Sequence, residues 1–419
     1  RKIMINKRAF ESPLLKHAWA FMPEGIRHTI SSEPIIPAIA AKAKAIAARN
    51  SGFIRSDQGQ IVGIFPEKEI YYGPSSGLEE LRQLVARFWT YAYRLKNRPG
   101  IPLNGLDKKN VAIVSGATEG LAIVMHLFAY KQNVGLTPLY WSNYKGIILN
   151  AGGNPVAIDF FDENYNVDFK NIERTIRDKK ITSVLINFPN NPSGDILTEN
   201  ELSNLAELAR DMDLTIISDE VYNFIRYKGE PQSMLSFAPE RTVVVSSASK
   251  EYLIPGARVG YVIAAEKTFT NSWMPKMIRS FSSSPNVLGQ RILIDVLKEE
   301  VKDFENGRPP HVISEIKKEL KQRCDLIISI LSEKGFALAG RDKDFPSGAI
   351  SVLARLPEDI KVDDKAFVDK AMELEKFSVV PASVFGAPRC IRFGYAGMTQ
   401  ETIKRLSQNL QDVLDFFRK

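Results

Sequence analysis

Residues 183–222 read SVLINFPNNPSGDILTENELSNLAELARDMDLTIISDEVY, with a short apolar run near each end. The first run, Ser183–Ile186, lacks polar alternation, which is typical of a strand covered on both faces. An amphipathic segment, Glu199–Met212, follows it, and Leu214–Ile217 is a second run of the same kind. A strand, a helix and a strand in this order predict one unit of a doubly wound α/β sheet.

The same alternation extends from about residue 111 to residue 265. Its other apolar runs are Val111–Val114, Val134–Leu136, Val156–Ile158, Thr242–Val245 and Val259–Ala264. Helix-like segments such as Glu119–Tyr130 and Phe169–Asp178 lie between them. We therefore predict an α/β fold whose large domain holds a mostly parallel sheet, with ligands bound beyond the carboxyl ends of the strands.

The two ends of the chain differ from this middle part, and 419 residues are too many for one compact core. Helices are predicted near Ala38–Arg49, Val312–Lys334 and Gln400–Phe417, and strands at Ala349–Ala354 and Cys390–Tyr395. We predict a large domain over residues 46–305 and a smaller α+β domain over residues 306–419. Residues 1–45 are expected to form an N-terminal arm that belongs to the small domain.

Composition excludes several classes of protein. A hydrophobic content of 44% and a charged content of 25% are ordinary for a soluble globular protein. The net charge of +7 comes from 56 basic residues mixed with 49 acidic ones, without the basic arm of a nucleic-acid binder. The four histidines show no metal-ligand spacing, and no apolar run approaches the roughly 20 residues of a membrane span. Two cysteines without a CxxC motif suggest a reducing, cytoplasmic setting.

Polar residues follow several of the predicted strands. Ser115–Glu119 forms a strand-to-helix turn of small residues, which suits either phosphate binding or an ordinary turn. Asn187–Gly194 has two junctions of asparagine with proline, which suit a cis peptide bond or a purely structural turn. Asp219 ends an apolar run, so its carboxylate needs a cationic partner or a raised pKa.

The most informative segment follows Thr242–Val245. It reads Ser246-Ser247-Ala248-Ser249-Lys250 and continues to an arginine, Arg258, that lies between Gly256 and Gly260. A lysine taken at random is a solvated surface charge. Lys250 is distinguished by hydroxyl side chains one and three residues before it and by an arginine eight residues after it.

Together these segments resemble the motifs of the class I and II aminotransferases, which are pyridoxal-phosphate enzymes of fold type I. The resemblance runs from about Tyr72 to Arg392, with the motifs in the family's order and spacing. It implies pyridoxal 5'-phosphate as the cofactor. It also implies amino-group transfer between an α-amino acid and a 2-oxo acid, in a ping-pong cycle through the pyridoxamine form.

The resemblance assigns roles to the lysine and its surroundings. Lys250 resembles the lysine that holds the cofactor as an imine and then moves the substrate's α-proton. Ser247, Ser249 and Arg258 are expected near the cofactor phosphate. The phosphate turn of the family corresponds to Gly116, Ala117 and Thr118.

Other motifs imply further contacts. NNPSG places Asn191 at the pyridine hydroxyl and near the substrate, and DEVY places Asp219 at the pyridine nitrogen and Tyr222 on the cofactor's hydroxyl. Ile391-Arg392-Phe393 resembles the strand whose arginine binds the substrate α-carboxylate. Tyr72 begins a YxxxxG motif, in which the tyrosine reaches the phosphate of a neighbouring subunit. A homodimer with shared active sites is therefore expected.

The sequence departs from the family pattern at two places. One extra residue precedes Tyr144, so either Trp141 or Tyr140 could stack on the cofactor, and we favour Trp141. Ser32-Glu33-Pro34 stands where the family has Gly-Glu-Pro, which leaves Ser32 as a candidate contact with the substrate. Arg279 lies near a position where some relatives read an acidic side chain, but a surface arginine is the simpler interpretation.

Two other functions are compatible with parts of this pattern. A pyridoxal-phosphate lyase, cyclising synthase or decarboxylase on the same fold would share Lys250, Asp219 and Arg258. A non-enzymatic regulator that binds the cofactor would need a DNA-binding module ahead of the domain. Only about 70 residues precede Tyr72, and they are expected to be the enzyme's own arm and first helix.

Overall fold

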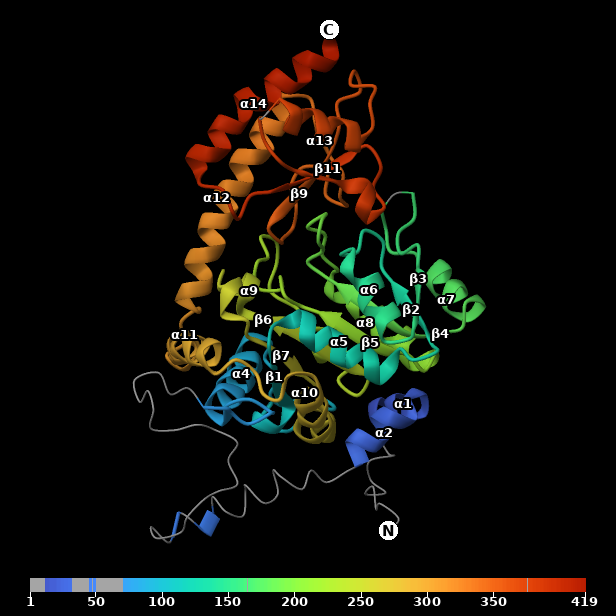
Figure 1. Ribbon diagram of the computed structural model, residues 1–419, viewed down its shortest axis with the longest axis vertical. Coiled ribbons are helices and arrows are strands. Elements are labelled where there is room, and N and C mark those ends of the chain that lie inside the picture. The colour runs from blue at the N-terminus through green and yellow to red at the C-terminus, as the bar shows by residue number, and fades with distance from the viewer. Residues whose placement is uncertain (1–11, 32–44, 47, 50–70, 164, 375) are drawn as a thin grey trace.

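The computed structural model describes residues 12–31, 45–46, 48–49, 71–163, 165–374 and 376–419. Two sheets organise the described residues, one in each of two domains (Figure 1). The larger sheet has seven strands in the order β1-β7-β6-β5-β4-β2-β3. Its strands are β1 (Val111–Val114), β2 (Asn133–Leu136), β3 (Asn154–Ala157), β4 (Ile181–Asn187), β5 (Thr215–Asp219), β6 (Thr242–Ser247) and β7 (Gly260–Ile263).

The large sheet is mostly parallel, which confirms the predicted fold class. Strands β3, β2, β4, β5 and β6 run parallel to one another, whereas β7 is antiparallel to both β6 and β1. The sequence predicts β7 as a strand but not its direction. Only a single helical turn, α9 (Ala248–Glu251), follows β6, so the chain turns back instead of crossing the sheet on a full helix.

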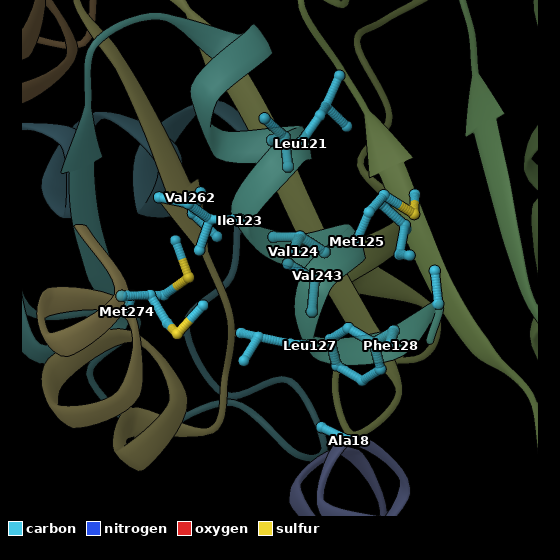
Figure 2. Close-up of a cluster of buried hydrophobic side chains, with 14 of the residues drawn as sticks. Ala18, Leu121, Ile123, Val124, Met125, Leu127, Phe128, Val243, Val262 and Met274 are labelled. Atoms are coloured by element: carbon cyan, nitrogen blue, oxygen red, sulfur yellow. The ribbon is translucent and has the colours of Figure 1, made fainter. Parts of the chain in front are cut away.

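Helices cover both faces of this sheet (Figure 1). They are α4 (Glu79–Ala92), α5 (Ala117–Phe128), α6 (Asn143–Asn150), α7 (Phe169–Asp178), α8 (Glu199–Asp211), α10 (Met274–Ser282) and α11 (Val287–Glu305). The core around α5 is shown in Figure 2, where Val124 and Phe128 lie beside Val243 of β6. Burial of α5 fixes the position of its amino-terminal end, which faces the functional site.

The small domain holds a second sheet with the strand order β10-β11-β9-β8. These strands are β8 (Ala337–Leu338), β9 (Ser351–Arg355), β10 (Val380–Pro381) and β11 (Cys390–Gly394). Its helices are α12 (His311–Glu333), α13 (Asp364–Glu373) and α14 (Gln400–Arg418). Figure 1 shows α12 running from the end of α11 into this domain, where it lies along α14.

The N-terminal helices lie away from the small domain. Helix α1 (Pro13–Phe21) packs against α5, and α2 (Glu24–Ser31) packs against α10 (Figure 1). Both contacts are with the large domain, whereas the sequence pattern groups residues 1–45 with the small one. The reason is that Leu14, Leu15 and Ala18 form an apolar face that completes the core around α5. Most of the predicted Ala38–Arg49 helix lies outside the described residues.

Within the described parts of the chain, no helix combines the length and the apolar character that a membrane crossing requires. The same parts contain no group of three or more His, Cys, Asp or Glu side chains placed to hold a metal ion.

Candidate functional site

A cavity of about 370 Å³ lies where the small domain meets the carboxyl ends of the large-sheet strands. That volume is within the range of small-molecule sites. The cavity is lined by most of the residues that the sequence singles out, namely Ala117, Thr118, Trp141, Asn191, Asp219, Tyr222, Ser247, Ser249, Lys250, Arg258 and Arg392. The strands and the turns that follow them bring together residues that lie far apart in the sequence, such as Ala117 and Arg392.

Lys250 lies on α9, directly after β6, and its half-buried side chain enters the cavity. Burial lowers the pKa of its amine, the positive charge of Arg392 lowers it further, and Asp219 opposes both effects. The Lys250 amine makes no hydrogen bond or ion pair with any residue that the structure describes. It is therefore a partly desolvated amine that is free to react.

Asp219 ends β5 and is only 4% exposed. Its Oδ2 accepts a hydrogen bond of 2.5 Å from the hydroxyl of Tyr144, and Oδ1 accepts one of 3.3 Å from the backbone N–H of Val221. Burial raises the pKa of Asp219 to about 6, although both hydrogen bonds and the charge of Lys250 act in the opposite direction. A buried carboxylate of this kind is suited to a cationic ligand group.

The bond between Tyr144 and Asp219 is not predicted from the sequence, in which Tyr144 serves only to mark a spacing. The signal that could have identified it is general: a tyrosine buried in a core needs a partner for its hydroxyl. Asn187 is a second missed residue. Its side chain donates to the carbonyl oxygen of Asp219 over 2.9 Å and accepts from the N–H of Asn191 over 3.1 Å. It thereby joins two strand ends.

The turn after β1 lies directly against Arg258. Gly116 precedes α5 with a φ of +92°, and a Cβ built there would lie 2.6 Å from the Arg258 guanidinium. Arg258 donates to the carbonyl oxygen of Ser115 over 3.1 Å. Ser247 and Ser249 line the same cavity. A helix N-terminus, an arginine fork and hydroxyl groups are the components of a phosphate site.

Arg392 lies on β11 and faces Asn191 across the domain boundary. Its Nη1 donates to the Asn191 Oδ1 over 3.3 Å, and its Nε is buried without a hydrogen-bond partner in the described chain. Burial lowers the pKa of Arg392, while the nearby Tyr222 raises it. An unsatisfied buried guanidinium favours a carboxylate ligand. The bonds Phe188–Pro189 and Asn191–Pro192 are cis, as the proline pattern of this loop suggests.

Other predicted site residues have different placements. Trp141 lines the cavity and meets the ring of Tyr144 edge-on, whereas Tyr140 packs beneath Lys145 outside the cavity lining. Tyr72 is 70% exposed and does not line the cavity of its own chain. Ser32 lies outside the described residues. Arg279 is half-buried on α10.

Comparison with known families matches residues 67–410 to the family described as Aminotransferase class I and II. An aspartate aminotransferase of Bacillus subtilis is 26% identical over 400 residues, covering 88% of this chain and 94% of the relative. Aromatic-amino-acid aminotransferase 2 of Thermococcus litoralis is 27% identical over 355 residues, covering 82% of this chain and 84% of the relative.

Solved structures agree with these sequence matches. The aromatic aminotransferase of Pyrococcus horikoshii superposes with a TM-score of 0.70 at 25% identity, covering 83% of this chain and 88% of that one. The aspartate aminotransferase of Thermus thermophilus with maleate superposes with a TM-score of 0.72, covering 95% of this chain and 98% of that one. At 22% identity, the second comparison establishes the fold alone.

Proposed function

The chain belongs to the aminotransferase class I and II family and is an aminotransferase; from this membership we propose that it works with pyridoxal 5'-phosphate bound covalently to Lys250. The observation that carries the proposal is the pairing in one cavity of a free, partly desolvated lysine amine with a buried carboxylate, Asp219. An enzyme that uses this cofactor would need an amine to bind it covalently and a carboxylate to keep its ring nitrogen protonated.

The residues present fit the cofactor group by group. Arg258, Ser247, Ser249 and the N-terminus of α5 would hold a phosphate dianion. Asp219 would accept from a protonated ring nitrogen, which supplies the cation that its buried carboxylate lacks. Asn191 and Tyr222 would face the ring hydroxyl, and Trp141 would cover one face of the ring.

The residues also have distinct roles in the transfer. When bound, the cofactor supplies a protonated ring that withdraws electrons from the substrate's α-carbon. The Nζ of Lys250 would accept the proton from the substrate's α-carbon. Burial lowers the pKa of this amine, which makes the neutral form that can accept a proton easier to reach. The Arg392 guanidinium orients the substrate through its α-carboxylate.

The relatives narrow the donors that should be tested first. Their names include aspartate and aromatic-amino-acid aminotransferases, so we propose that this chain uses an amino acid of one of these two kinds. Asn191 and Arg392 would bind the α-carboxylate common to both kinds. Ser32 remains a candidate substrate contact on sequence grounds.

The attachment site can be tested directly. The protein loaded with cofactor is reduced with borohydride, digested and mapped by mass spectrometry. We expect the pyridoxyl label on the peptide that contains Lys250, and Lys250→Ala should lose both the label and amino-group transfer. A label on any other peptide would refute the assignment.

A lyase or decarboxylase reaction on the same fold is separated by a second measurement. Mixing with an amino acid should convert the bound cofactor to its amine form, and a 2-oxo acid should reverse the change. Failure of this reversal, with release of ammonia or carbon dioxide instead, would favour the other chemistry.

We further propose a homodimer with shared active sites, because the exposed Tyr72 lies outside its own chain's cavity. A reducing, cytoplasmic location is also proposed. It is supported by two buried cysteines, Cys324 and Cys390, that form no disulfide.

A further inference from the structure

Arg341 makes an unusually complete set of contacts between the two domains. It lies on the segment between β8 and β9 of the small domain. Its guanidinium donates two hydrogen bonds to the carboxylate of Glu201 on α8, from Nη2 to Oε1 over 2.6 Å and from Nη1 to Oε2 over 3.1 Å. Both side chains are mostly buried, with exposed fractions of 20% and 15%. A two-pronged, shielded pair of this kind fixes geometry better than a surface ion pair.

Every other bond of Arg341 also reaches the large domain. Nε donates to the carbonyl oxygen of Tyr165 over 3.0 Å, and Nη1 donates to that of Ile196 over 2.9 Å. The backbone N–H donates to the Asp195 Oδ1 over 2.7 Å. The guanidinium lies 5.1 Å from the ring centre of Phe161. A lysine could reproduce the charge but not this arrangement of donors.

The loop that Arg341 contacts is the one that carries Asn191. The backbone carbonyl of Asp195 accepts from the N–H of Asn190 over 2.8 Å, which closes the loop. The small-domain backbone approaches closely, because a Cβ at Gly340 would lie 2.8 Å from the Asp195 Oδ1. A displacement of Asp195 would therefore move Asn191 with it.

The same segment is continuous with the sheet that carries Arg392. Strand β8 pairs with β9, and β9 pairs with β11, where Leu353 lies opposite Arg392. Ser351 at the start of β9 donates to the carbonyl oxygen of Pro192 over 3.3 Å. Strand pairing and hydrogen bonds thus connect Arg341 to the pair formed by Arg392 and Asn191.

We propose that Arg341 is a positioning residue for substrate binding: it fastens the small-domain sheet to the loop 190–195 and so holds Arg392 and Asn191 at the spacing that binds the α-carboxylate. This inference rests on the proposed role of Arg392. Arg341 itself does not line the cavity. The charge on Glu201 supports the assignment, because bonds from Arg341 and Thr198 outweigh burial and lower the pKa of Glu201.

The test compares substrates with and without the α-carboxylate. Initial steady-state rates are measured on the cofactor-loaded full chain at a saturating 2-oxo acid, over a range of concentrations of the best amino acid donor or of the primary amine that lacks its α-carboxylate. Arg341→Met should raise the KM for the amino acid about tenfold and leave the rate with the amine unchanged. Arg341→Lys keeps the charge but not the paired N–H donors, so its KM for the amino acid should lie between those of the wild type and the Met variant. Glu201→Gln should weaken amino-acid binding in the same sense.

Arg210→Met is the matched control. Arg210 also lies on α8 and also bonds a carboxylate and a carbonyl, those of Glu240 and Phe237, but all three groups belong to the large domain. We expect this variant to keep the wild-type KM. Melting temperatures of all variants separate general loosening from a specific effect, and the Lys and Gln variants keep the test valid if the Met variant does not fold.

The outcomes are distinct. A selective loss with the amino acid supports positioning by Arg341. Equal losses with amino acid and amine, or a wild-type KM in every Arg341 and Glu201 variant, would overturn it. If the wild type itself shows no preference for the amino acid over the amine, the proposed role of Arg392 fails first, and the inference fails with it.

Discussion

Two buried glutamates lie directly after the residues that define the site. Glu220 follows Asp219, and its carboxylate accepts from Ser218, Ser233, Asn223 and the backbone of Met234. Glu251 follows Lys250, and within the described part of the chain it accepts only from Ser246 over 2.9 Å and Tyr261 over 2.8 Å. Burial raises the pKa of Glu220 to about 7 and that of Glu251 to about 8. Neither side chain lines the cavity.

Glu251 should make stability fall as pH rises. Its folded pKa of about 8 lies above the ordinary value of 4.5, so the folded chain keeps a proton that the unfolded chain has already released. The contribution of the protonated Glu251 to the free energy of unfolding is complete below pH 4.5, and it is lost as pH rises through about 8. Glu251→Gln resembles the protonated acid and should remove part of this loss, on the order of a few kcal/mol.

Denaturant unfolding at pH 5 and pH 8 checks this expectation. The Gln variant should lose less stability between the two values than the wild type. Glu220 keeps some pH dependence in both proteins, because its pKa is raised in the same direction. Glu207→Gln on the exposed face of α8 is the control and should follow the wild type. An identical slope in the Glu251 variant would contradict a protonated Glu251.

At the scale of elements, the apolar pattern predicts the strands better than the helices that cover them. It predicts β1 and α7 residue for residue, because their buried positions are apolar without interruption. Helix α4 is not predicted, since its buried face includes the polar residues Arg82 and Thr90. Arg82 is satisfied by the carbonyl of Val111 and the side chain of Asn271, partners that are 29 and 189 residues away.

The same limit applies to the site. Motifs that follow strands identify Lys250 and Asp219, because each occupies a fixed position at a strand end. The contacts of Tyr144 and Arg341 are not predicted, because only the folded chain brings Tyr144 to Asp219 and Arg341 to Glu201. Motif spacing therefore predicts side chains that follow a strand directly. It does not predict side chains whose partners lie far away in the sequence.

Helix α1 should detach from the large domain in acid. His17 lies on this helix between the rings of Phe21 and Phe128, and its Nε2 is buried without a hydrogen-bond partner in the described chain. Burial lowers the pKa of His17 to about 4, with Asp213 opposing and Arg241 adding to the shift. The pKa of this histidine in the unfolded chain is 6.5. The contribution of neutral His17 to the docking of α1 is therefore complete above pH 6.5 and is lost as pH falls through about 4.

Hydrogen exchange of α1 between pH 7 and pH 5 measures this loss, once intrinsic exchange rates are corrected for. The wild type should lose on the order of 1–2 kcal/mol of protection in α1, whereas His17→Gln should lose less. His28→Gln, at an exposed position on α2, serves as the control. Equal losses in wild type and His17→Gln would show that another group governs the docking of α1.

At the scale of the molecule, one surface has the character of an interface. Tyr71, Tyr72, Phe281, Leu288 and Ile292 are each at least 43% exposed. They belong to one region, because Ser75 donates to the carbonyl of Ser283 over 2.9 Å and a Cβ at Gly73 would lie 3.1 Å from Val287. A group of exposed apolar side chains in one region favours contact with a second subunit.

If Tyr72 serves the partner's cavity, two defective chains should restore one working site. Co-expression of Tyr72→Ala and Lys250→Ala with different affinity tags, followed by tandem purification, isolates only mixed dimers. In such a dimer, the Tyr72→Ala chain keeps its lysine and receives an intact tyrosine from its partner, so about half of the wild-type activity should return. The assay uses a cofactor concentration at which the Tyr72→Ala homodimer is nearly inactive.

Each alternative gives a different result in the same experiment. A monomer would not survive the tandem purification, because the two tags would separate. A dimer in which Tyr72 contacts only its own chain would purify but remain inactive, since each of its sites would lack one of the two residues. A mixed dimer of wild type and Lys250→Ala is the control, and it too should show about half activity. Restoration therefore requires both the second subunit and the crossing of Tyr72 into its cavity.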